Sequence, residues 1–229
     1  RNSTWTMSRD TSLGLKFAGV MYYDGQGFMV KKSLGVDSAL KLDGATVCTQ
    51  TGTTTELNLA DYFKANNMKY QVVAIENNDE VLKAYLDGRC DIFTTDQSGL
   101  YAERVKFPNP DEHMVLPEII SKEPLGPGVR QGDDAWFNAG KWTYFALLTA
   151  EEFGITQANA DDMVKTASEP TGNPEMKRIL GIKNDDGSAA GFGTGIGLDE
   201  DWVVHVVKGV GNYAEIFERN VGMGTPLKI

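Results

Sequence analysis

The sequence predicts an α/β fold in which helices cover a parallel sheet, and two observations support this prediction. Residues 45–105 alternate between β-branched runs and helical periodicity in the order β-α-β-α-β-α. Such alternation is typical of a parallel sheet with helices on both faces. After Gly132 the apolar pattern is almost entirely helical. We therefore expect a complete α/β lobe in the first half and a helical second half that needs a sheet to pack on.

The expected strands are short runs of β-branched and apolar residues bounded by turn signals. Three of them lie within the alternating segment, and each is followed by a helical pattern. Parallel strands joined in this way bring their carboxyl ends to one edge of the sheet, where ligands bind in open α/β folds. The expected strands are 3–6, 27–30, 45–48, 70–75, 90–95 and 115–120.

The expected helices show apolar residues at intervals of three and four. Asn78-Asp79 and Asp133-Asp134 offer capping side chains for two of them, and Gly88 offers a stop. Residues 184–197 form a glycine-rich loop before the last helix. The expected helices are 57–63, 80–87, 98–105, 135–153, 159–167, 174–180 and 199–220.

The composition narrows the class of partner. The chain has 229 residues and a formal net charge of -10. Phosphate binding needs a surplus of Lys and Arg on one face, so this acidic balance argues against a nucleic-acid partner. No apolar run approaches the roughly 18–20 residues of a membrane span. Because the sequence opens with Arg1 rather than Met, we expect that the chain has been processed or cut.

The segment Gln50–Glu56 leads from the first strand of the alternating region directly into a helix. Free backbone N–H groups at a helix start favour an anion, and the threonine hydroxyls add donors. Gly52 allows a ligand to approach the backbone closely. The segment would suit a carboxylate or a phosphate. Taken alone, it is also explained as an ordinary turn with capping threonines.

The third strand of the alternating region is closed by Asp96. A carboxylate beside an anion site suits an ammonium group, although taken alone it is also explained as a helix N-cap. Together, the two positions offer an anion pocket and a cation pocket close to each other. This combination indicates a zwitterionic ligand, namely an α-amino acid.

Several groups of residues resemble the polar amino-acid-binding proteins of ABC importers. They are Thr4–Arg9, Gln50–Glu56, and Asp87–Asp91 with Asp96 closing the strand. The chain is more closely similar to the general L-amino-acid-binding branch of that family, and the resemblance covers essentially all 229 residues. The segments that fit this branch are 22–28, 210–213 and 217–220.

The resemblance implies how the ligand's carboxylate is held. Arg9 would grip the α-carboxylate bidentately, which its guanidinium fork does better than the ammonium group of a lysine. Thr53 and Thr54 would hold the same carboxylate by hydroxyl and backbone N–H groups. Residues 7–8 depart from the Pro-Glu or Asp-Glu that is usual in the family, which leaves the shape of the turn before Arg9 open.

The resemblance also assigns the rest of the site. Asp96 would take the ligand's α-ammonium group, helped by Thr4 and by a backbone carbonyl near Ser3. Gln50 would point toward the ligand side chain. No cofactor, metal ion or catalytic residue is implied.

The resemblance implies a type II periplasmic-binding-protein clamshell with two doubly wound lobes, the first of which is incomplete in this chain. Residues 1–27 would be a remnant of lobe 1 and the hinge, 28–126 the complete lobe 2, and 127–229 the mostly helical return to lobe 1. The family's opening segment has no counterpart here. A missing N-terminal segment or a second copy of the chain would therefore complete lobe 1.

The function implied is periplasmic binding of L-amino acids for delivery to the membrane permease of an ABC importer, without enzymatic activity. Two alternatives keep the same clamshell: an enzyme such as a dehydratase, and an amino-acid-sensing ectodomain. An enzyme would need an acid/base pair facing the ligand, and Asp96 is the only good candidate for such a role. Turnover of a bound amino acid would distinguish an enzyme from a binding protein.

Two other motifs carry weaker signals. Gly191–Gly197 contains the glycines of a dinucleotide loop, but it follows no clear strand and lacks an acidic residue at the required spacing. His113 and His205 are far apart and have no partners at metal-ligand spacing. We therefore expect a loop at the glycines and a structural role for His205.

Cys48 and Cys90 are the two cysteines of the chain, and by count alone a disulfide and two free buried thiols are almost equally favoured. In the doubly wound order the first and third strands are neighbours. Each cysteine precedes its candidate site residue by a few positions, so both should lie at a similar height. Adjacent strands are about 4.8 Å apart, within the Cα window of about 4.4–6.8 Å for a bridge. We therefore predict a disulfide between them.

Overall fold

The computed structural model describes residues 3–188 and 191–228. It divides into two compact units, each built from chain segments that the other interrupts. In the part of the chain that is described, no helix is long and apolar enough to cross a membrane. The first unit contains the residues up to Trp5 and Tyr22–Gly126, and the second contains Thr6–Met21 and the chain from Pro127 onward.

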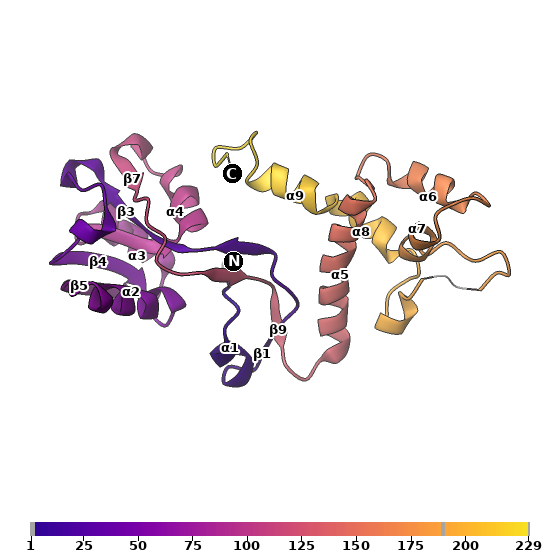
Figure 1. The fold of residues 1–229 in the computed structure, drawn as a ribbon, viewed down its shortest axis with the longest axis horizontal. Coiled ribbons are helices and arrows are strands. Elements are labelled where there is room, and N and C mark those ends of the chain that lie inside the picture. Colours follow the sequence, from indigo (N-terminus) through magenta and orange to yellow (C-terminus); the bar gives the residue numbers. More distant parts are fainter. Residues whose placement is uncertain (1–2, 189–190, 229) are drawn as a thin grey trace. The chain divides into compact units, whose positions relative to one another are not determined.

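A mixed sheet organises the first unit (Figure 1). Its strands are β3 (Gln26–Lys31), β4 (Ala45–Gln50), β5 (Tyr70–Ile75), β6 (Ile92–Asp96) and β7 (His113–Val115). They follow the order β5-β4-β6-β3-β7 across the sheet. β4 pairs in parallel with both β5 and β6, which confirms the parallel arrangement expected for residues 45–105. β3 pairs antiparallel with β6 and with β7.

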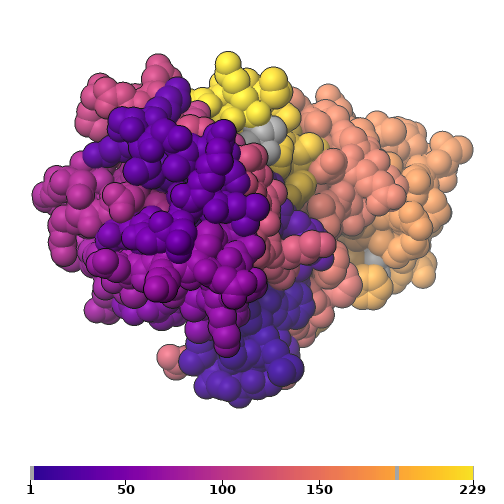
Figure 2. All heavy atoms as spheres, turned by 60° about the vertical axis from the view of Figure 1, so that its left-hand side comes forward, coloured from indigo at the N-terminus to yellow at the C-terminus, as the bar shows by residue number. Residues whose placement is uncertain are grey.

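Helices cover both faces of this sheet because successive strand residues point to opposite sides. Phe28 packs with residues of α2 (Thr54–Ala65) in one buried cluster. Its neighbour Met29 packs with residues of α3 (Asn78–Leu86) and α4 (Gln97–Arg104) in another. In the space-filling view, the indigo-to-magenta atoms of residues 22–126 form one continuous body (Figure 2). The first unit therefore has a core on each side of its sheet.

The helices of the first unit begin at side-chain caps, one of which differs from the expectation. Asn77 is the N-cap of α3 and accepts hydrogen bonds from the N–H groups of Asp79 and Glu80, at 2.8 and 3.4 Å. The capping role expected of Asn78 and Asp79 is wrong, because both residues lie within the helix itself.

Short strands join the sheet to the rest of the chain. The strand expected at 3–6 is reduced to an isolated bridge between Thr4 and Leu125. β2 (Tyr22–Asp24) pairs antiparallel with β8 (Glu123–Leu125). Sequence patterns do not reveal β2 or β8, because three residues are too short to show an alternation.

The strand expected at 115–120 lies instead at His113–Val115. Pro117 has no N–H group to donate to a neighbouring strand, so the regular ladder ends before it. Beyond it, the N–H of Ile120 still donates to the carbonyl of Gln26 at 2.9 Å. The segment thus continues along the sheet edge without regular pairing.

The second unit combines a two-stranded ribbon with helices. β1 (Leu15–Phe17) pairs antiparallel with β9 (Gly128–Arg130). Neither β1 nor β9 is among the strands expected from the sequence. Small and aliphatic side chains form a buried cluster around α5 (Asp134–Glu152) and α8 (Trp202–Val210). The other helices of the unit are α1 (Met7–Thr11), α6 (Ala160–Ser168), α7 (Pro174–Ile179) and α9 (Tyr213–Asn220).

The helix expected at 199–220 is two helices, α8 and α9, that meet at Gly211. Gly211 ends α8 with a φ of 80°, which favours glycine, and a Cβ there would come within 2.8 Å of the Glu215 carboxylate. Asn212 begins α9 with a capping box, in which its side chain and that of Glu215 each accept the other's backbone N–H. The apolar periodicity hides the break because it continues across it.

Single-turn helices complete the structure. Residues 189–190 of the expected glycine-rich loop lie outside the described residues, and the loop also contains one such turn. The 3₁₀ turns are η1 (Lys32–Leu34), η2 (Ala39–Lys41), η3 (Pro110–Glu112) and η4 (Thr194–Ile196).

Candidate ligand site

The carboxyl ends of β4 and β6 lie at the same edge of the sheet. The two strands are parallel neighbours, with Val47 opposite Ile92 and Cys48 opposite Phe93. β4 ends at Gln50 and leads into α2, whereas β6 ends at Asp96 and leads into α4. The sheet therefore brings the two segments predicted to hold the ligand's opposite charges to adjacent strand ends, as expected for an open α/β fold.

The turn between β4 and α2 is closed by its own side chains. Thr53 is the N-cap of α2: its hydroxyl accepts from the N–H of Glu56 at 3.3 Å and donates to the carbonyl of Gln50 at 2.7 Å. The carboxylate of Glu56 accepts from the N–H of Gly52 at 2.8 Å. One backbone donor of the predicted anion site is thus occupied by a carboxylate of the protein. No pattern in the sequence indicates this contact.

Asp96 is buried, with 5% of its surface exposed. It is the N-cap residue of α4, but within the described structure its side chain makes no capping hydrogen bond to that helix. Asp24 performs this role, since its carboxylate oxygens accept from the N–H of Ser98 at 3.3 and 3.4 Å. The capping alternative for Asp96 is therefore not what the structure shows.

Thr4 and Thr54 meet although they are 50 residues apart in the sequence, with 3.5 Å between their hydroxyl oxygens. Thr4 is buried at 5% exposure. Both hydroxyls donate to the same carboxylate oxygen, Oε2 of Glu123, at 2.5 Å from Thr4 and 3.3 Å from Thr54. Glu123 was not a candidate in the sequence, because an acid between a lysine and a proline carries no recognisable pattern.

The remaining predicted residues are Gln50, Ser3 and Arg9, which lie on separate segments of the chain. Gln50 is exposed, and its amide donates to the carbonyl of Glu76 at 2.7 Å. The carbonyl of Ser3 accepts from the N–H of Gly126 at 3.1 Å. Arg9 lies on α1 in the second unit, whereas Ser3, Thr4, Gln50, Thr53, Thr54 and Asp96 all belong to the first.

One tyrosine beside this sheet edge has a shifted pKa, and the described residues offer no group of metal ligands. Burial, and then the charge of Asp24, raise the pKa of Tyr22 on β2, so its phenol stays protonated at neutral pH. Among the described residues, no three His, Cys, Asp or Glu side chains are grouped as a metal ion would require. The polar groups at this edge are suited to hydrogen bonding and to charge pairing.

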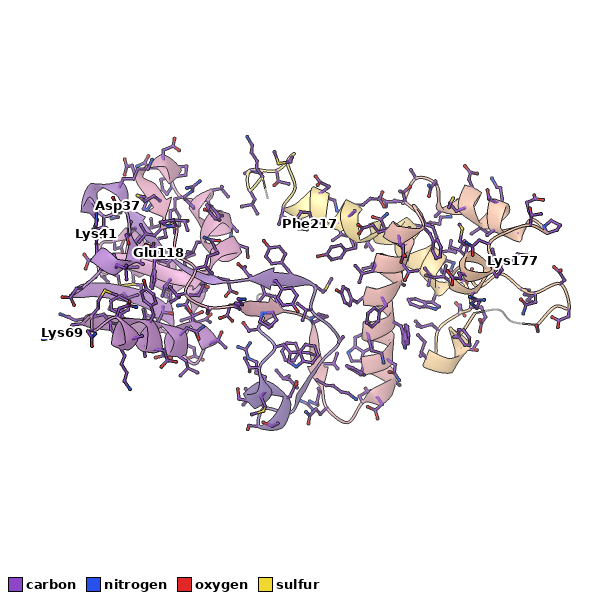
Figure 3. All side chains as sticks on the ribbon, in the orientation of Figure 1. Asp37, Lys41, Lys69, Glu118, Lys177 and Phe217 are labelled. Atoms are coloured by element: carbon purple, nitrogen blue, oxygen red, sulfur yellow. A yellow bond between two sulfur atoms is a disulfide. The ribbon has the colours of Figure 1, made fainter. Side chains whose placement is uncertain are left out.

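A disulfide lies beneath the candidate site. Cys48 and Cys90 are bonded, with 5.6 Å between their Cα atoms, which confirms the predicted bridge (Figure 3). However, the prediction that the two cysteines lie at a similar height on adjacent strands is wrong. Cys48 is opposite Phe93, and Cys90 lies in the loop before β6 begins at Ile92. The bridge therefore joins β4 to the loop that enters β6.

Two apolar hollows lie in the second unit, and neither is lined by a predicted site residue. One, of about 450 Å³, is lined by Trp142, Phe145 and Phe192 among others. The other, of about 610 Å³, is lined by Trp136, Tyr144 and Val206 among others. Trp202 lines both hollows. The large side chains remain exposed to a notable degree, 63% for Trp136 and 78% for Phe192.

No family model matches the chain. Similar curated proteins nevertheless exist. The chain is 62% identical over 229 residues to the general L-amino acid-binding periplasmic protein AapJ of Rhizobium johnstonii. It is 53% identical over 227 residues to the glutamate/glutamine/aspartate/asparagine-binding protein BztA of Rhodobacter capsulatus. These matches cover 100% and 99% of the chain, and the chain spans 64% of the length of each relative.

A solved structure is also similar, that of an ABC transporter/periplasmic binding protein from Brucella ovis with glutathione bound. It superimposes with a TM-score of 0.90 at 58% sequence identity. The match covers 100% of this chain and 69% of that one. The agreement in fold therefore extends over the whole length of the chain.

Proposed function

Because the chain belongs to the periplasmic binding proteins of ABC transporters, we propose that it binds L-amino acids in the periplasm for delivery to an ABC importer. The observation that carries the proposal is the edge of the sheet where β4 and β6 end side by side. There the amino terminus of α2, with its threonines, adjoins a buried carboxylate that does not cap its own helix. An amino-acid zwitterion needs this combination of donors and negative charge.

The proposed contacts divide between the two ends of the ligand. Thr54, together with the backbone at the start of α2, and Arg9 would hold the α-carboxylate. Asp96 and Thr4 would hold the α-ammonium group. Thr53 would contribute mainly by fixing the turn, since its hydroxyl already bonds within it. Ser3 and Gln50 would lie at the margin of the site.

We further propose that the first unit is lobe 2 of a clamshell and that the second unit is part of lobe 1. The support is the exposed apolar surface of the second unit, which needs a cover. The chain spans 64% of the curated relatives, so additional polypeptide is available in such proteins to provide it. A second copy of the chain is the alternative cover, and the permease would be the partner of the assembled protein.

Titration calorimetry across the twenty L-amino acids, using the full natural protein, tests the proposed ligand. We expect several polar L-amino acids to bind with similar affinity and D-amino acids and sugars to bind poorly. Binding of sugars alone would contradict the proposal. A parallel assay for ammonia release addresses the dehydratase alternative, which the names of the relatives disfavour because they are binding proteins.

A second ligand class is suggested by the glutathione in the Brucella ovis structure. Glutathione is γ-linked, so its glutamyl end keeps a free α-carboxylate and a free α-ammonium group. The proposed zwitterion contacts would therefore suit that end as well as an amino acid. Competition by glutathione against L-glutamate tests this, with the α-linked glutamyl peptide as the control because its α-carboxylate is consumed in the peptide bond.

A further inference from the structure

Glu123 is a buried carboxylate surrounded by neutral donors. Only 2% of its surface is exposed. Its Oε1 accepts from the amide of Asn58 at 2.7 Å and from the hydroxyl of Ser121 at 2.5 Å. Its Oε2 accepts from the hydroxyls of Thr4 and Thr54. Four donors, two of them from α2, thus converge on one side chain, and two of the four belong to the proposed ligand site.

The contact with Glu123 decides what the hydroxyl of Thr4 can offer a ligand. A threonine hydroxyl carries one hydrogen and two lone pairs. The short 2.5 Å contact commits the hydrogen of Thr4 to the carboxylate, and hydrogen bonds to ionised acceptors are the strong ones. Toward a ligand, the Thr4 oxygen can therefore only accept. An accepting oxygen suits an ammonium group and repels a carboxylate.

Thr54 is held more loosely by the same carboxylate. Its hydroxyl lies 3.3 Å from Oε2, longer than the roughly 2.5–3.0 Å that is typical of a hydrogen bond between oxygens. Breaking this contact costs less than breaking that of Thr4, so the Thr54 hydrogen can turn to a ligand carboxylate. One buried acid thereby gives two neighbouring threonines opposite roles.

We infer that Glu123 is a positioning residue of the ligand site, which holds Thr4 as the acceptor for the ligand's α-ammonium group and leaves Thr54 able to donate to its α-carboxylate. The inference rests on the proposed function, because it assigns roles at the same site. Glu123 itself acts through the two threonines.

The test is a double-mutant cycle on the full natural protein, read by calorimetry with L-glutamate and L-glutamine. Glu123→Gln keeps the shape but replaces one acceptor oxygen with a donor, and Thr4→Val removes the hydroxyl. Each single variant should bind about tenfold to a hundredfold more weakly, as expected for losing a hydrogen bond to a charged group. The double variant should be little worse than Thr4→Val alone, because most of the effect of Glu123 passes through its short contact with Thr4 and little through the longer one with Thr54.

Glu118→Gln is the matched control. Glu118, labelled in Figure 3, belongs to the same unit and accepts from the hydroxyl of Ser38 at 2.5 Å. Its other hydrogen bonds are to backbone groups of Ala39 and of Glu118 itself, so its loss should leave affinity within about twofold of the parent. If Glu123→Gln does not fold, Glu123→Asp replaces it in the cycle, because it retracts the carboxylate by one methylene.

The outcomes separate the inference from the function. A parent that binds no amino acid overturns both. A parent that binds, with Glu123→Gln behaving like the Glu118 control, overturns the inference alone. Additive losses in the double variant also overturn it, since they would mean that Glu123 affects binding independently of Thr4. Weak single variants with a strongly non-additive double variant support it.

Discussion

At the scale of single residues, Asp96 carries the largest predicted effect on binding. It is buried at the end of β6 and does not cap the helix that follows. Asp96→Asn should therefore remove the charge that we propose pairs with the ligand's ammonium group. We expect a loss of roughly 2–5 kcal/mol in binding free energy, typical of a buried charge pair that loses one partner.

The control for Asp96 is Asp37→Asn. Asp37 is exposed and pairs with Lys41 at 2.7 Å on the surface of the same unit, as labelled in Figure 3. Exposed pairs of this kind contribute little to stability, and this one has no proposed contact with the ligand. Calorimetry that finds equal affinities for the two variants would remove Asp96 from the site.

His113 is a second residue with a measurable consequence. Its Nδ1 lies 2.8 Å from the hydroxyl of the buried Tyr85. Burial, reinforced by the charge of Lys31, lowers the pKa of His113 below its usual 6.5. The unfolded chain therefore binds this proton at a higher pH than the folded one. The stability from a neutral His113 is full above pH 6.5 and declines as the pH falls through the folded pKa.

Chemical denaturation between pH 7.5 and 5 checks the prediction for His113. His113→Asn should flatten the decline in unfolding free energy over this interval. A proton NMR titration that places the pKa of His113 at or above 6.5 would contradict the prediction.

At the scale of elements, the sequence predicted the long elements well and the short ones poorly. The helices from α2 to α7 follow apolar periodicity, which a sequence displays directly. β1, β2, β8 and β9 have three residues each, and their pairing depends on partners more than 95 residues away. The Thr4–Glu123 contact was invisible for the same reason, because it joins residues 119 positions apart.

The bridge between β4 and the loop before β6 gives a prediction at this scale. It closes a loop with a sequence separation of 42 residues. The chain-entropy account assigns such a loop about 3–4 kcal/mol of stabilisation. We expect the unfolding free energy of the Cys48→Ser/Cys90→Ser variant to be lower by this amount. Its denaturation midpoint should fall accordingly. Thiol titration of the denatured, unreduced parent should find no free thiol, and two free thiols would contradict the bridge.

At the scale of the whole molecule, the second unit predicts association. Trp136 and Phe192 expose 63% and 78% of their surfaces beside apolar hollows. Exposed apolar patches of this kind mark interaction surfaces. We expect the 229-residue chain, expressed alone, to sediment as a concentration-dependent oligomer, and the full natural protein to sediment as a monomer. Two results together would contradict this prediction. The short chain would be a monomer, and a dye that fluoresces on binding apolar surface would show no increase in fluorescence with it. The apolar surface of the second unit would then need no cover.

The interleaved layout of the two units sets an order for their assembly during translation. Tyr22–Gly126 is one contiguous stretch and includes both cysteines, whereas the second unit must join Thr6–Met21 to a segment that begins only at Pro127. Contacts between nearby positions close at a lower entropic cost than distant ones. As the chain emerges from the ribosome or the secretion channel, the first unit can therefore collapse and oxidise on its own. The contacts of residues 6–21 with the segment after Pro127 form only once that segment has emerged, and during this interval the nascent protein depends on chaperones.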